Sequence, residues 1–133
     1  MKMKQILFAL TLAMSIAGCD NIRNQHSSKA GSPSGKYSFS TFINQSDKSS
    51  AEYGYVVIDL FDADGNKISS LNTAINSFKK WAIGWDSSSD IIVMYTREMG
   101  TFAWKIENAQ LISIEVTDDI EKQADVLRTE KYN

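Results

Sequence analysis

The sequence has little of several chemically important residues: of its 133 residues, one is cysteine, one is histidine and one is proline. The histidine, His26, falls in a segment that we expect to be a tether. We therefore expect no serine–histidine–aspartate triad, no cysteine–histidine pair and no histidine-based zinc site in the folded domain. No glycine-rich phosphate loop is present either. These absences exclude most common enzyme classes and predict a binding protein without metal or cofactor.

Long hydrophobic runs are also missing. The apolar stretch at residues 6–17 spans about twelve residues, whereas a membrane-spanning helix needs roughly twenty. Lys2 and Lys4 precede this stretch, and the small residues Ala17 and Gly18 follow it. A basic start, a short apolar run and small residues are typical of a signal peptide. We therefore expect residues 1–18 to be removed, and no later segment to cross a membrane.

The only cysteine, Cys19, directly follows that stretch in the motif "IAGC", residues 16–19. This motif resembles the lipobox of bacterial lipoproteins, and the resemblance covers only the first twenty residues. It implies that Cys19 carries a thioether-linked diacylglycerol and that its new amino group is acylated, for example with palmitate. Two or three acyl chains make such anchoring effectively permanent. The alternative is a secreted protein with a free thiol at Cys19.

Asp20 follows the cysteine. An aspartate at this position resembles the signal that retains enterobacterial lipoproteins in the inner membrane. The resemblance therefore implies a lipid-anchored protein on the periplasmic face of the inner membrane of a Gram-negative bacterium.

The remaining chain divides into two parts. Residues 19–36 are rich in serine, glycine and asparagine and contain Pro33, so we expect a lipidated start followed by a flexible tether. Residues 37–133 have the length of a single domain. Acidic residues outnumber basic ones in that domain, which argues against a nucleic-acid partner. The sequence leaves the oligomeric state open.

The domain has the pattern of a mainly β protein, of the α+β class, with a small antiparallel meander and a C-terminal α-helix. Short apolar runs alternate with turn residues. The turn "DADGN" predicts a two-residue hairpin at Asp64 and Gly65. Residues 72–80 are compatible with a short helix or a loop. Asp118 and Glu121 occupy positions like those of a capping box and predict the helix at residues 118–133.

Aromatic side chains are the main candidates for a binding surface. Tryptophan and tyrosine provide a large contact area at low entropic cost. We expect most of them to fill the core, with Tyr53 and Tyr95 partly exposed, and Arg97 at an exposed hairpin tip. The candidate surface residues are Tyr53, Tyr95, Arg97, Trp81, Trp85 and Trp104.

These observations predict a membrane-tethered lipoprotein that binds a protein partner: a toxin that it neutralises, a phage component that it blocks, or an envelope complex that it helps to assemble. Two alternatives remain. One is a structural envelope accessory. The other is binding or weak hydrolysis of a cell-wall glycan, with stacked aromatic side chains and a carboxylate pair. The carboxylates available for that pair are Asp59, Asp62, Asp86, Asp90 and Glu98.

Overall fold

The computed structural model describes residues 26–44 and 54–133. These residues form two four-stranded antiparallel sheets and one helix, which confirms the mainly β, α+β class with a C-terminal helix. The first sheet consists of β1 (Ala30–Gly31), β2 (Tyr37–Asn44), β3 (Tyr55–Asp62) and β4 (Lys67–Asn76). The second consists of β5 (Trp81–Trp85), β6 (Ile91–Thr96), β7 (Gly100–Glu107) and β8 (Gln110–Ser113). The helix is α2 (Asp118–Tyr132).

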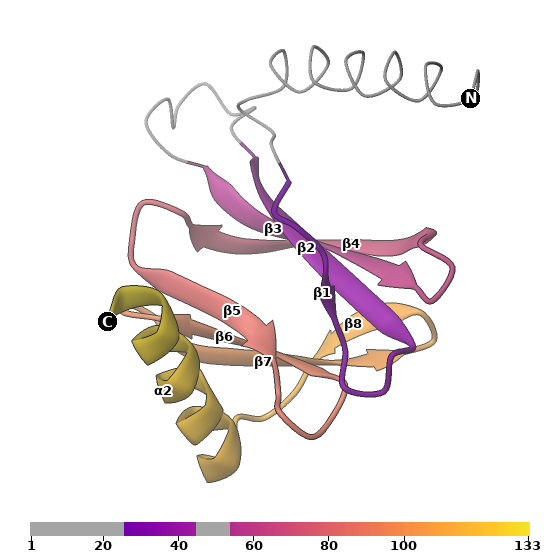
Figure 1. Cartoon of the computed structure of the whole chain (residues 1–133). Helices are drawn as coiled ribbons and strands as arrows, with labels where there is room; N and C mark the ends of the chain where they lie inside the picture. Colours follow the sequence, from indigo (N-terminus) through magenta and orange to yellow (C-terminus); the bar gives the residue numbers. More distant parts are fainter. Residues whose placement is uncertain (1–25, 45–53) are drawn as a thin grey trace, which may run out of the picture.

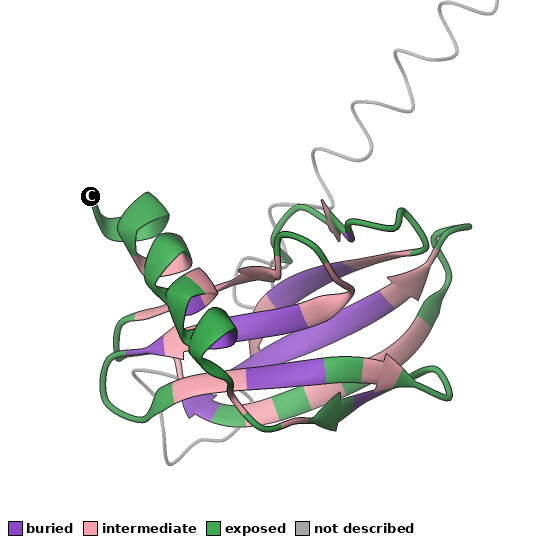
Figure 2. Ribbon diagram, turned by 90° about the horizontal axis from the view of Figure 1, so that it is seen from below, coloured by how far each residue is buried: buried purple, intermediate pink, exposed green. Residues whose placement is uncertain are grey.

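The molecule has three layers (Figure 1). Within each sheet the strands follow sequence order, so each sheet is a meander, and the two meanders pack face to face. Helix α2 covers the outer face of the second sheet. Burial is concentrated in the middle strands, as Figure 2 shows. The inner face of the second sheet therefore packs on the first sheet, and its outer face packs on the helix.

The alternating pattern of the sequence explains the inner faces, because successive side chains of a strand point to opposite sides. Trp81, Ile83 and Trp85 pack against the core between the sheets, and so do the alternate residues Phe102 and Ile106 of β7. Their spacing of two residues therefore places these side chains on the inner face of the second sheet. In β6 both faces are buried, which agrees with its uninterrupted apolar run.

The turns differ in detail from the expectation. Gly65 has φ +87°, whereas Asp64 is not among the described residues with positive φ. The Gly65 amide donates to the Asp62 carbonyl, so the β3–β4 connection is a four-residue turn closed by a glycine and not a two-residue hairpin. A two-residue hairpin does join β7 to β8, where Asn108 and Ala109 both have positive φ.

Residues 72–76 continue β4 as a strand, so the short helix considered for this segment is wrong. Helix α2 begins where expected, but its cap is Thr117 and not Asp118: the Thr117 hydroxyl accepts a hydrogen bond from the Ile120 amide. The stripe of Ile120, Ala124 and Leu127 packs on the second sheet.

Residues 26–36 of the predicted tether pack on the first sheet, so the described fold begins before residue 37, the expected start of the domain. β1 pairs with β2, the Ser27 amide donates to the Thr41 carbonyl, and Ser32 is buried. The Trp85 indole donates to the Ala30 carbonyl. The composition of the segment suggested flexibility, but the unpaired edge of β2 supplies backbone partners that a local pattern does not reveal.

Candidate functional site

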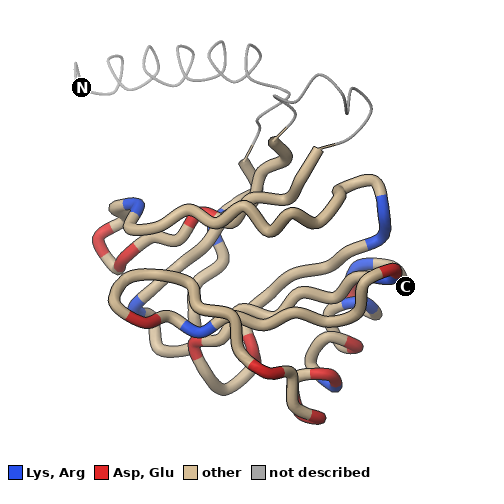
Figure 3. Tube along the Cα trace, turned by 180° about the vertical axis from the view of Figure 1, so that it is seen from behind, with Lys and Arg blue, Asp and Glu red and all other residues tan. Residues whose placement is uncertain are grey.

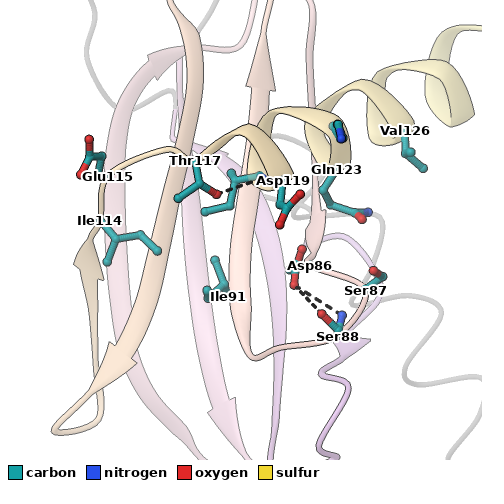
Figure 4. A pocket seen from close by; sticks show the side chains of 12 residues that line it. Asp86, Ser87, Ser88, Ile91, Ile114, Glu115, Thr117, Asp119, Gln123 and Val126 are labelled. Atoms are coloured by element: carbon teal, nitrogen blue, oxygen red, sulfur yellow. Dashed lines mark hydrogen bonds between the residues drawn. The ribbon is translucent and has the colours of Figure 1, made fainter.

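A pocket of about 550 Å³ lies at one end of the second sheet. Three segments line it: the β5–β6 connection, the β8–α2 connection and the first turns of α2 (Figure 4). Its lining residues include Asp86, Ser87, Ser88, Ile91, Ile114, Glu115, Thr117, Asp119, Ile120, Lys122, Gln123 and Val126. We call this the far pocket, because it lies at the opposite end of the second sheet from the β4–β5 connection.

The β5–β6 wall of the far pocket is held by Asp86. Its carboxylate accepts hydrogen bonds from the Ser88 and Ser89 hydroxyls at 3.3 and 2.7 Å, and its backbone amide donates to the Ile91 carbonyl at 2.7 Å. Asp90 in the same connection accepts bonds from both the backbone amide and the hydroxyl of Ser34. Ser34, in the segment that we expected to be a tether, thus helps to hold this wall in place.

The chemistry of the far pocket combines apolar and anionic groups. Ile91, Ile114 and Ile120 supply apolar surface, while the carboxylates come from Asp86, Glu115 and Asp119. Lysine and arginine side chains have an apolar stem and a cationic head. A basic side chain or segment of a protein is therefore the kind of ligand that this lining complements.

The structure does not bring the expected aromatic surface together. Trp104 is buried in the core between the sheets, and Trp85 packs edge-on against Phe39 with ring centroids 5.4 Å apart. Tyr95 points to the other face of the second sheet, where it packs against the cluster beneath α2. Trp85 and Trp104 thus serve packing, as we expected for most of the aromatic side chains, and Tyr95 is half-buried. The three residues do not share the single face that the alternative of an aromatic platform requires.

Trp81 and Arg97 lie at the end opposite the far pocket. The Arg97 amide donates to the Lys80 carbonyl, and the Arg97 side chain is exposed in the β6–β7 turn, as expected for a hairpin tip. Trp81 is half-buried, and the Lys131 ammonium lies 3.9 Å from its ring centroid. Cys19, Asp20 and Tyr53 lie outside the described residues.

Sequence reasoning missed a second site, on the outer face of the first sheet. Asp59 is only 1% exposed there, and its carboxylate accepts a 2.7 Å bond from the Ser70 hydroxyl. His26 Nδ1 lies 3.5 Å and Lys67 Nζ lies 3.9 Å from Asp59 Oδ2. The expectation that His26 stays apart from the domain is therefore wrong.

A pocket of about 330 Å³ surrounds this carboxylate, and His26, Ser27, Lys29 and Lys67 contribute to its lining. The signal available in the sequence was an aspartate inside the most strongly apolar strand, "YVVIDLF". A charged residue in such a strand needs partners, because burying an unpaired charge is costly. The partner His26 was not visible, since it lies 33 residues away in a polar segment.

Two exposed groups have shifted pKa values. Backbone hydrogen bonds from Asn66 and Asp64 lower the pKa of Asp62 in the β3–β4 turn. The hydrogen bonds and charge of Asp125 raise the pKa of Arg128, its neighbour one turn away on α2. Both effects stabilise local structure and lie outside the two pockets.

The remaining carboxylates considered for glycan hydrolysis are spread over separate connections: Asp62 precedes the β3–β4 turn, and Glu98 lies in the β6–β7 turn. Over residues 26–44 and 54–133, no three histidine, cysteine, aspartate or glutamate side chains gather as a metal site. Within the same residues, no helix has the length and apolar character needed to span a bilayer.

Comparisons with known proteins give no relative: no family model, no curated protein and no solved structure matches this chain.

Proposed function

We propose that this chain is a lipid-anchored protein of the bacterial cell envelope that binds a protein partner through the far pocket. The observation that carries the anchor is the lipobox-like "IAGC" that ends at Cys19. Asp20 supports retention on the periplasmic face of the inner membrane. The anionic and apolar lining of the far pocket supports a partner that presents a basic segment.

The folded start of the domain shortens the tether. Because residues from His26 onward pack on the first sheet, only seven residue steps separate the domain from Cys19. At 3.3–3.6 Å per residue, that chain spans at most about 25 Å. The lipid therefore holds the domain no farther from the bilayer than about its own diameter. This raises the local concentration of its binding surface near the membrane, where a partner protein of the envelope acts.

The anchor is tested by mass spectrometry of the mature amino terminus. We expect a diacylglycerol thioether and an added acyl chain on Cys19, and membrane fractionation that is lost in Cys19→Ser. Asp20→Ser tests sorting, with the variant expected to move to the outer membrane. A soluble wild-type protein with a free thiol at Cys19 would overturn the anchor.

The partner is tested by in-cell photo-crosslinking from the far pocket. A photoreactive amino acid is placed at Val126, which lines the pocket and is 48% exposed. The matched control carries it at Asp64, an exposed residue in the β3–β4 turn of the other sheet. We expect one protein adduct from position 126 that is weaker in an Asp86→Asn, Asp119→Asn background. Equal adducts from both positions, or none from position 126, would contradict the assignment of the partner to this pocket.

A further inference from the structure

The end of the molecule opposite the far pocket is cationic and aromatic. Three elements meet there: the β4–β5 connection, the β6–β7 turn and the end of α2. We call this the cationic end, and we define it by Phe78, Lys79, Lys80, Trp81, Arg97, Met99, Lys131 and Tyr132. Two acidic side chains, Glu98 and Glu130, belong to the same segments.

Direct contacts join these elements. Lys131 Nζ donates to the Trp81 carbonyl at 2.7 Å, and the Tyr132 hydroxyl donates to the same carbonyl at 2.8 Å. The Trp81 amide in turn donates to the Tyr132 hydroxyl at 3.0 Å. Lys80 Nζ lies 5.1 Å from the Tyr132 ring centroid. The last turn of α2 is thus fastened to the start of β5, and ammonium groups surround the aromatic rings.

Two apolar side chains project from this end. Phe78 is 67% exposed and Met99 is 59% exposed, the highest values among the large hydrophobic residues described. The β6–β7 turn that carries Met99 is held in place, because the Thr96 hydroxyl accepts from the Met99 amide and donates to the Gly100 carbonyl. Exposed apolar side chains beside lysines are the combination found at membrane–water interfaces.

Charge separates along the molecule. Among the residues that line the far pocket or form the first turn of α2, Asp86, Glu115, Asp118, Asp119 and Glu121 are acidic and Lys122 is basic. At the cationic end, basic residues outnumber acidic ones. Figure 3 shows lysines in the β4–β5 connection and acidic residues around the start of α2. An anionic surface would attract one end of this domain and repel the other.

The cationic end also lies on the side of the first sheet where the described residues begin. The His26 ring packs at a tilt against the Phe42 ring, with centroids 4.6 Å apart, two residues before β2 ends. The last residue of β2, Asn44, pairs with Tyr55, which pairs with Asn76 at the end of β4. The β4–β5 connection follows directly. The start of the described chain and Phe78 therefore share one end of the first sheet.

We propose that the cationic end docks on the anionic phospholipid surface of the membrane that holds the lipid anchor, with Phe78 and Met99 at the headgroup boundary. The proposal rests on the lipid anchor of the proposed function and deepens it, because it sets the orientation of the domain. Each basic residue near an anionic bilayer strengthens partitioning about fivefold. The far pocket then faces away from the membrane, where a partner can reach it.

The test measures quenching of tryptophan fluorescence by brominated phospholipids. The chain from Cys19 onward, which contains every described residue, is coupled through its only thiol to maleimide-bearing lipid in vesicles. The vesicles contain brominated phosphatidylcholine, with or without phosphatidylglycerol. Trp81 is half-buried at the cationic end, whereas Trp85 lies at the other end of β5 and Trp104 is buried. Quenching therefore reports contact of this end with lipid.

We expect strong quenching in vesicles that contain phosphatidylglycerol. The quenching should be much weaker in vesicles without phosphatidylglycerol, at high salt, and in the Trp81→Phe variant. Lys79→Glu with Lys80→Glu should abolish it, while the single charge reversal Lys105→Glu on β7 should not. Circular dichroism checks that each variant is folded. The absence of quenching in phosphatidylglycerol vesicles, or equal quenching in the Lys79/Lys80 variant, would overturn docking. Because the coupling supplies the anchor chemically, this result is independent of whether Cys19 is lipidated in cells.

Discussion

The His26 imidazole lies against the buried Asp59 carboxylate, with 3.5 Å between Nδ1 and Oδ2. This contact joins the first described residue to the central strand of the first sheet. With the tilted ring contact of His26 with Phe42 and the cation–π contact of Lys29 with Phe61, it fixes the start of the described residues on the outer face of that sheet. The entry of the described chain into the fold is therefore set by side-chain contacts.

Asp59 is expected to matter for stability. Asp59→Ala removes the acceptor of the Ser70 hydroxyl and the counter-charge of Lys67, so we expect a loss of about 2–3 kcal/mol in the free energy of unfolding. Asp59→Asn keeps an acceptor oxygen and should cost about 1 kcal/mol. His26→Ala, in which the lost partner is half exposed, should cost less than about 1 kcal/mol. Urea unfolding measures all three, and a wild-type midpoint for Asp59→Ala would contradict this account.

Gly84 allows α2 to lie close to β5. A Cβ at this position would lie 2.6 Å from Leu127 Cδ2, so Gly84→Ala forces the leucine or the helix to move. Because the clash is with the end of a flexible, half-buried side chain, we expect a loss of less than about 1 kcal/mol from this overpacking. The double variant Gly84→Ala, Leu127→Ala should lose less than the sum of the two single changes, because the clash is gone. A strictly additive cycle in chemical unfolding would show that the two positions do not compete for space.

The backbone of the β7–β8 hairpin is strained at a residue that a glycine could replace. Ala109 has φ +60°, a conformation that costs a residue with a Cβ roughly 1 kcal/mol relative to glycine. Ala109→Gly creates the Asn-Gly pair favoured in such hairpins, so we expect a higher melting temperature and a gain of about 1 kcal/mol. Ala63→Gly is the control. It lies in the β3–β4 turn and is not among the described residues with positive φ, so it should bring no gain.

The Asp62 carboxylate should make the β3–β4 turn sensitive to acid. Hydrogen bonds from the Asn66 and Asp64 amides favour its ionised form and lower its pKa in the folded state. Its stabilising effect is therefore complete above the unfolded pKa of about 3.9 and is lost as the pH falls through the lower folded value. Asp62→Ala should lower the melting temperature at pH 5–7, with a difference that shrinks at more acidic pH.

The control for this titration is Asp64→Ala, which removes a charge from the same turn but leaves the Asp62 carboxylate and its backbone donors in place. Its melting temperature should differ from wild type by a smaller amount that depends less on pH. If the two variants show the same pH profile, the effect arises from net charge and not from the turn.

Some of the segments that form the candidate site could be predicted from the sequence. The "SSS" segment predicts a turn, and Asp118 and Glu121 predict the start of a helix; in the structure this turn and this helix line the far pocket. That these two walls face each other depends on α2 folding back across the outer face of the second sheet. The contact of Ile120 and Ala124 with Val93 and Ala103, which lie 17 or more positions earlier in the chain, places the helix there. No pattern local to either segment encodes that contact.

The sequence by itself determined the class of the domain, most of its strands and the helix, since residue alternation and helix periodicity are local properties. It also carries the lipobox-like motif at Cys19, from which the proposed anchor follows. Only the tertiary structure decided that the strands divide into two sheets, that residues 26–36 join the fold, and that acidic and cationic groups gather at opposite ends. The physical reason is that strand pairing, the burial of Asp59 and the meeting of α2 with β5 depend on contacts between residues far apart in the chain.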